Sequence, residues 1–148
     1  MVYGCVVSNE NIFLQKIDGT LNSEKYIHLL EEIIVPWING QNINNWIFQQ
    51  DNAPCHTSKK TLEWLKSNEI QLLQWPARSP DLNIIENVWS FITQEVYDGP
   101  QSNNINDFWT KIEEVANRIQ GEKITELFNS FNRRLLECFE KDGEETNY

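Results

Sequence analysis

Apolar residues gather in short runs in the first half of the chain, a pattern that predicts β-strands. Val2 to Val7 and Ile12 to Ile17 are β-prone runs separated by a polar turn, so we expect an antiparallel hairpin. Trp46 to Gln50 and Ile70 to Gln74 are further apolar runs of strand length. These runs would supply the strands of one sheet.

Helical spacing of apolar residues appears between and after these runs. Asn22 or Ser23 can cap a helix that ends near Gly40, although Pro36 could kink or stop it earlier. We expect two more helices, at about 58–67 and from 81–83 to Tyr97, the latter capped by Asp81 or Asn83.

Two apolar stripes in the tail predict a pair of packed amphipathic helices. Their members are Ile105, Phe108, Trp109, Ile112, Val115, Ala116 and Ile119, then Ile124, Leu127, Phe128, Phe131, Leu135 and Phe139. Arg133 and Arg134 are expected on a solvated face, and the polar end from Lys141 to Tyr148 is expected to fray. The order of elements predicts an α/β domain with a mixed sheet, with residues 1–103 as its core and 104–148 as a helical extension.

Composition narrows the class of protein. The 148 residues suit one domain with a real core, and no apolar run is long enough to cross a bilayer, so we expect a soluble intracellular protein with no membrane partner. The three cysteines lack the spacing of a zinc site. The formal net charge of −10 disfavours tight DNA binding by this chain alone, because duplex binding is driven by Lys and Arg.

Two blocks carry candidate chemistry. In QQDNAPCHTSKK, residues 49–60, Asp51 ends a predicted core strand, which is where α/β sheets place metals and ligands. Asp and Asn before Ala-Pro are also ordinary turn formers. In WPARSPDLNIIENVW, residues 75–89, Glu86 lies in the first turns of the predicted helix. An acidic residue there can simply complement the helix N-terminus.

Together, in this order and with this spacing, the blocks QQDNAPCHTS and SPDLNIIENVW resemble the two signature blocks of mariner-type transposases of the DDE superfamily. The segments MVYGCVVS and GTLN also resemble that family, whereas Ile84 stands where the family usually has Pro. The resemblance implies a ribonuclease-H-like fold with flanking helices and a metal-dependent endonuclease that cleaves DNA and transfers strands. It also implies a nuclear location.

The resemblance assigns Asp51 and Glu86 as the second and third carboxylates of a catalytic triad that binds Mg²⁺ or Mn²⁺. The first carboxylate would lie on a central strand upstream of Met1, so we expect an N-terminally truncated core. Asp18 is not a substitute, because it lies in a turn where the family has no catalytic residue. Without the central strand its neighbours would lie ~10 Å apart, twice the normal spacing, so we expect marginal stability, partner dependence or aggregation. In the family's arrangement the missing Asp is a ligand of both metals, so we expect no catalysis by the isolated chain.

Several other residues are candidate site-adjacent or DNA-contacting groups: Asn52, His56, Lys59, Lys60, Arg78 and Asn87. Local hydrogen bonding explains His56, and surface solubility the cations, nearly as well. The partners would be transposon ends and target DNA, with a dimer or a partner chain supplying the missing strand. The alternative is a non-catalytic remnant or a domesticated protein-binding module that uses the tail helices.

Overall fold

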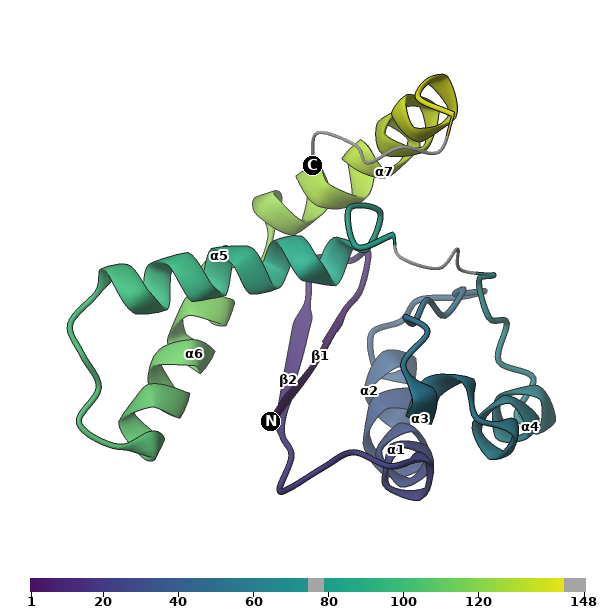
Figure 1. The fold of residues 1–148 in the computed structure, drawn as a ribbon, viewed down its shortest axis with the longest axis horizontal. Coiled ribbons are helices and arrows are strands. Elements are labelled where there is room, and N and C mark those ends of the chain that lie inside the picture. The colour runs from purple at the N-terminus through teal and green to yellow at the C-terminus, as the bar shows by residue number, and fades with distance from the viewer. Residues whose placement is uncertain (75–78, 143–148) are drawn as a thin grey trace. The chain divides into compact units, whose positions relative to one another are not determined.

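The computed structural model describes residues 1–74 and 79–142. The chain divides into two compact units, which are described separately below. The first unit comprises Met1–Tyr3 and Lys16–Ser79, and the second comprises Gly4–Gln15 and Pro80–Tyr148. Figure 1 shows the order of the elements along the chain.

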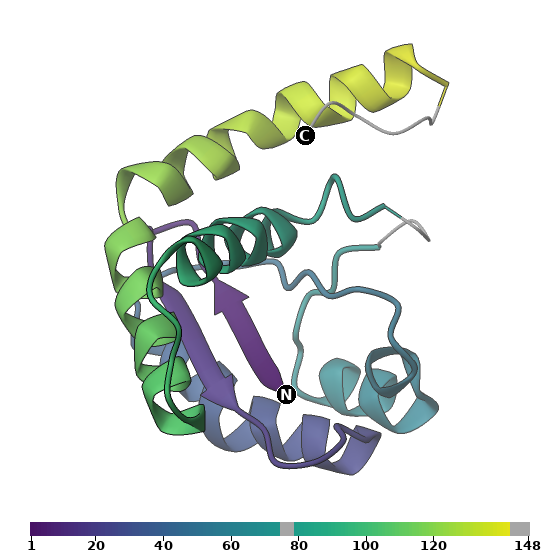
Figure 2. The same ribbon diagram turned by 60° about the vertical axis from the view of Figure 1, so that its left-hand side comes forward.

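The predicted hairpin is present. Strands β1 (Val2–Val6) and β2 (Ile12–Lys16) form a two-stranded sheet, and Figure 2 shows their arrows pointing in opposite directions. The connection closes through hydrogen bonds from the Val7 amide to the Asn11 carbonyl at 3.0 Å and from the Glu10 amide to the Val7 carbonyl at 3.1 Å. Glu10 takes a positive φ of 78°, as a tight turn requires of one residue.

In the first unit, a helical segment follows the hairpin: α1 (Ser23–Leu29), the π-helical turn η1 (Leu30–Ile34) and α2 (Val35–Asn39). The Asn22 side chain caps it by accepting a hydrogen bond from the Lys25 amide at 2.9 Å. Pro36 neither stops nor breaks this segment. The wider π turn precedes it, and such a turn relieves the clash between a proline ring and the preceding carbonyls.

Two short helices complete the first unit, α3 (Pro54–Thr57) and α4 (Lys59–Ser67). Ser58 caps α4 through the Thr61 amide. The Thr61 hydroxyl, which is fully buried, donates to the Cys55 carbonyl at 2.7 Å and so ties α4 to α3. The core of this unit consists of Tyr26, Leu29, Leu30, Ile34, Ile38, Phe48 and Leu65.

The runs at 46–50 and 70–74 were predicted to be strands. In the structure they form only one isolated parallel bridge, between Phe48 and Leu72. The Phe48 amide donates to the Gln71 carbonyl and the Leu73 amide donates to the Phe48 carbonyl, both at 2.8 Å. The backbone runs parallel as expected, but a strand needs consecutive ladder bonds and these two make a single bridge.

The second unit joins residues 4–15 of the hairpin to α5 (Ile84–Asp98), α6 (Ile105–Ile119) and α7 (Glu122–Glu140). The tail helices were therefore predicted correctly. Their core consists of Ile84, Val88, Ile92, Val96, Ile112, Val115, Ala116, Ile119, Ile124 and Leu127. Among the described helices, none has the length and apolar content needed to span a membrane.

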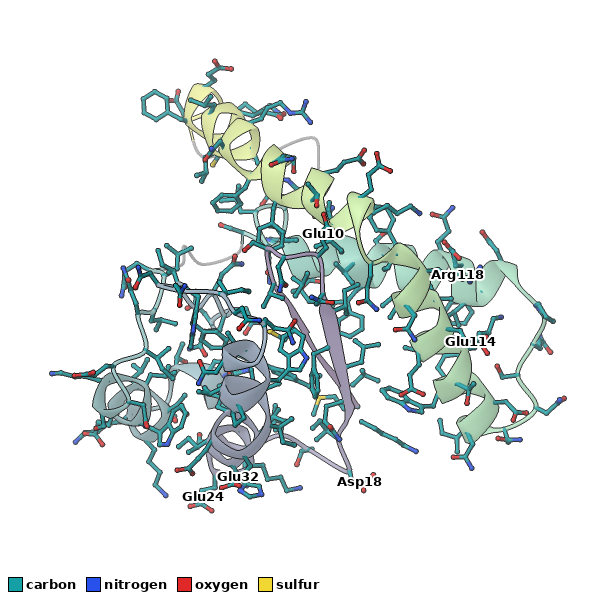
Figure 3. The ribbon with its side chains drawn as sticks, turned by 180° about the vertical axis from the view of Figure 1, so that it is seen from behind. Glu10, Asp18, Glu24, Glu32, Glu114 and Arg118 are labelled. Atoms are coloured by element: carbon teal, nitrogen blue, oxygen red, sulfur yellow. The ribbon has the colours of Figure 1, made fainter. Side chains whose placement is uncertain are left out.

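Side-chain contacts fasten the hairpin to these helices within the second unit. The Thr125 hydroxyl donates to Glu10 Oε1 at 2.5 Å, and Figure 3 places Glu10 beside the ribbon of α7. Gly4 allows a closer approach, because a Cβ built there would lie 2.5 Å from the Trp89 ring of α5. Burial raises the pKa of the neighbouring Cys5 thiol to about 12, so this thiol stays protonated at neutral pH.

Two expectations about the tail were wrong. Arg134 does not face solvent, because only 1% of its surface is exposed. Leu135 and Phe139, which belong to the apolar stripe, are 43% and 82% exposed. Of the end that was expected to fray, Lys141 forms an ion pair with Glu137 at 2.8 Å, and residues 143–148 lie outside the described residues.

Candidate functional site

Asp51 lies between the extended segment that ends at Gln50 and the short helix α3. Its Oδ1 accepts a hydrogen bond from the Ala53 amide at 3.0 Å and contacts His56 Nδ1 at 2.6 Å. No hydrogen bond to Oδ2 occurs among the residues that the structure describes. Because the side chain is 52% exposed, one carboxylate oxygen is fixed and the other is open to a ligand.

The contact between His56 and Asp51 specifies where the imidazole carries a proton. An ionised carboxylate can only accept hydrogen bonds, so Nδ1 must be the donor. His56 is therefore either the neutral Nδ1–H tautomer or the imidazolium. The His56 side chain is only 15% exposed and lies directly beside Asp51.

Tyr26 and Gln50 hold His56 in place. The Tyr26 ring, which is fully buried, lies 4.2 Å from the His56 ring between centroids. The Tyr26 hydroxyl donates to Gln50 Oε1 at 2.8 Å, and Gln50 Nε2 donates to the His56 carbonyl at 3.0 Å. The sequence prediction missed both supporting residues: Gln50 precedes Asp51 in the same block, whereas Tyr26 looked like an ordinary member of the helical stripe.

Glu86 lies in the first turn of α5, in the second unit. Its amide donates to the Asn83 carbonyl at 3.0 Å, while its side chain is exposed and has no hydrogen bond or ion pair with any other described residue. Asn83 occupies the N-cap position as predicted but makes no capping hydrogen bond through its side chain. The Glu86 carboxylate is therefore free to bind a cation.

Asn87, an expected site-adjacent residue, is hydrogen bonded within the protein. Its Oδ1 accepts from Arg134 Nη1 at 2.7 Å. The same nitrogen donates to the Asp81 carbonyl, also at 2.7 Å. The amide oxygen of Asn87 is thus turned toward α7.

The cationic candidates in the first unit are paired with acidic side chains. Lys59 lies 3.7 Å from Glu63, and Lys60 lies 2.8 Å from Glu24, which Figure 3 places at the start of α1. The hydrogen bond and the charge attraction between Lys60 and Glu24 lower the pKa of Glu24 and raise the pKa of Lys60. Exposed pairs of this kind contribute little to stability, so a phosphate could replace either carboxylate.

The remaining candidates add less to the geometry. Asn52 is exposed next to Asp51. Arg78 lies outside the described residues. Asp18 lies in the connection between β2 and α1 (Figure 3), where the sequence placed it.

Asp51, Asn52, His56, Lys59 and Lys60 all lie in the first unit, around α3 and the start of α4, whereas Glu86 and Asn87 lie in the second. Within residues 1–74 and 79–142, no group of three or more His, Cys, Asp or Glu side chains could hold a metal ion. Carboxylate oxygens are nevertheless the ligands that hard divalent cations prefer. Asp51 and Glu86 thus each offer an oxygen of the kind that such an ion prefers, but among the described residues neither belongs to a cluster large enough to hold one.

Residues 1–109 match the family described as DDE superfamily endonuclease. Among curated proteins, the chain is 32% identical to the transposase of transposable element Tcb1 from Caenorhabditis briggsae and 31% identical to that of Tc3 from Caenorhabditis elegans. All of this chain aligns with each, but it covers 54% of the first and 45% of the second. The chain therefore spans about half the length of these relatives.

Solved structures agree on the fold. The catalytic domain of Mos1 transposase, determined with Raltegravir and Mn, superposes with a TM-score of 0.83 at 18% identity over 99% of this chain and 76% of that one. A Mos1 paired-end complex with the left transposon end gives 0.83 at 19% identity over 97% and 44%. The predicted ribonuclease-H-like α/β fold is confirmed. With most of its length matching the family, this chain belongs to the DDE superfamily endonucleases.

Proposed function

We propose that this chain is part of a transposase catalytic domain and supplies Asp51 and Glu86 as two ligands of a divalent cation that serves DNA cleavage and strand transfer. The observation that carries the proposal is the state of the two carboxylates. Asp51 keeps Oδ2 open while Oδ1 is held by the Ala53 amide and His56, and Glu86 has no partner among the described side chains. Unpaired carboxylates next to supporting groups suit a cation.

The bound ion would be Mg²⁺ or Mn²⁺. Either would polarise a phosphodiester and help generate an attacking oxygen, which carboxylates alone cannot do. The residues of this chain would hold the ion, and His56 would keep Asp51 in the orientation that leaves Oδ2 free. A complete site needs further ligands, from water or from a carboxylate outside the described residues.

The substrate would be DNA, as transposon ends and as target. The net charge of −10 makes strong binding by these residues alone unfavourable, so most of the phosphate contacts would come from other segments or from a second copy. Lys59 and Lys60 would contribute by exchanging their carboxylate partners for phosphates. Arg78 and Asn52 would be further DNA-contacting residues, and the location that we propose from the family resemblance is the nucleus.

Replacing the matching segment of the Tcb1 transposase with these 148 residues tests this function. We expect Mn²⁺-dependent nicking of transposon-end DNA, lost by more than about 100-fold in Asp51→Asn and Glu86→Gln, because each removes a metal ligand. Asp98→Asn, an exposed acid at the end of the same helix α5, serves as the matched control and should nick normally. Equal nicking by all variants would contradict the proposal, and a chimera that folds without nicking would favour the non-catalytic alternative.

A further inference from the structure

A buried arginine on the last helix contacts the start of the helix that carries Glu86. Arg134 is the largest of the fully buried side chains in the described part of the chain, at 1% exposed. A guanidinium stays protonated in proteins, so burying it is costly unless hydrogen bonds replace its hydration. The burial of Arg134 therefore requires well-placed hydrogen-bond acceptors.

The hydrogen bonds of Arg134 reach two separate elements. Nε donates to Ser130 Oγ at 2.9 Å, one turn earlier on α7. Nη1 donates to the Asp81 carbonyl and to Asn87 Oδ1, both at 2.7 Å. The first bond fixes the guanidinium on its own helix, and the other two join it to the loop before α5 and to the first turns of α5.

These two acceptors lie on either side of Glu86 in the sequence. The segment between them is buried at Leu82, Asn83 and Ile84, which are 3%, 8% and 5% exposed. The helix start lacks the usual capping bond from its N-cap side chain. Arg134 therefore supplies a restraint on this helix start of the kind that α1, α4 and α6 obtain from their N-cap side chains.

The Glu86 side chain forms no hydrogen bond or ion pair with the described residues that would orient it. The place of its carboxylate is therefore set by the backbone of the first turn of α5. Small displacements of a catalytic group cause large losses of rate. A clamp on that turn would control Glu86 without touching it.

We propose that Arg134 is a positioning residue for Glu86 and that α7 is therefore part of the working site. The proposal rests on the function proposed above. Arg134 lies beyond residues 1–109, the segment that matches the family. The last helix is thus more than a cover for the core, because it fixes the helix turn from which the metal-binding carboxylate projects.

Hydrogen exchange of the 148-residue chain, measured by mass spectrometry without metal, tests the clamp. Arg134→Met keeps the apolar stem and removes the donors, so we expect amides of residues 81–88 to exchange at least ~10-fold faster while those of α6 remain as in the wild type. Arg133→Met, on the exposed neighbour, is the matched control and should change neither region. Uniformly faster exchange across the second unit would reduce Arg134 to a stabilising residue and overturn the proposal.

A milder variant keeps the test open if Arg134→Met does not fold. Asn87→Ala leaves the bonds to Ser130 and the Asp81 carbonyl intact, and we expect a smaller rise in exchange confined to the same segment. Exchange like that of the wild type in a folded Asn87→Ala would contradict the clamp.

The link to Glu86 is tested by Mn²⁺ affinity, measured by titration under conditions where each variant remains folded. Loss of a residue that supports a ligand weakens metal binding by ~10-fold or more, which is the result expected for Arg134→Met but not for Arg133→Met. Unchanged affinity with locally faster exchange would overturn the positioning role. If instead Asp51→Asn and Glu86→Gln leave Mn²⁺ binding unaltered, the proposed function fails, whatever Arg134 does to exchange.

Discussion

At the scale of single residues, the structure shows that Asp51 and Glu86, which the sequence analysis assigned the same role, are supported differently. Asp51 is held by an amide and an imidazole at 3.0 and 2.6 Å, while Glu86 is held only by its backbone. Their supports therefore differ: Asp51 depends on His56 close by in the sequence, and Glu86 depends on a helix turn fastened from far along the chain. A substitution that disturbs Asp51 should therefore lie close to it in the sequence, whereas one that disturbs Glu86 can lie far along the chain.

His56→Ala should destabilise the first unit by about 1 kcal/mol, the usual net value of a hydrogen bond. The variant also removes the ring stacked on Tyr26. Urea unfolding followed by tryptophan fluorescence measures the change. His28→Ala is the matched control, because His28 is exposed on α1 and forms no hydrogen bond or ion pair through its side chain with the described residues. If both variants unfold alike, His56 does not hold Asp51 in the way described.

At the scale of elements, close packing between β1 and α5 decides where the helix that carries Glu86 can lie. Gly4 lies directly against the Trp89 ring, and Trp89 follows Glu86 by less than one helical turn. A side chain at position 4 would push this helix away from the strand. Gly4 is required here because a side chain would prevent the strand from approaching the Trp89 ring, and not because the backbone needs the conformational freedom of glycine.

Gly4→Ala should lower the free energy of unfolding by about 1–3 kcal/mol, the usual cost of overpacking. Combining it with Trp89→Leu, which makes room for the new methyl group, should cost less than the sum of the two single changes. Thermal or urea unfolding of the four chains in this cycle measures the coupling. Additive effects would mean that the strand and the helix do not meet at this point.

The helices could be predicted from periodicity because each apolar face repeats locally, as in α6 and α7. The sequence predicted whole strands around Phe48 and Leu72 where only one bridge forms, since a ladder depends on a partner in register and the local pattern does not show one. Arg134 was misplaced for a related reason. Nothing local separates it from Arg133, and its acceptors lie 47 and 53 residues away.

At the scale of the whole molecule, the family and fold followed from two short blocks, whereas the arrangement of the site did not. Asp51 and Glu86 belong to different compact units, so their meeting at one cation remains a prediction that rests on the family resemblance. A net charge of −10 adds repulsion that a bound cation would offset locally. The proposed function requires one divalent ion to bind both carboxylates.

Mn²⁺ titration of the ¹⁵N-labelled chain, followed by paramagnetic broadening of its NMR signals, tests this meeting most directly. The account predicts that the amide signals of Asp51 and Glu86 broaden together with one midpoint, and that Asp51→Asn removes the broadening at Glu86 while Asp98→Asn leaves it. Broadening of the two signals at unrelated Mn²⁺ concentrations, or at Glu86 undiminished in Asp51→Asn, would contradict a shared cation site.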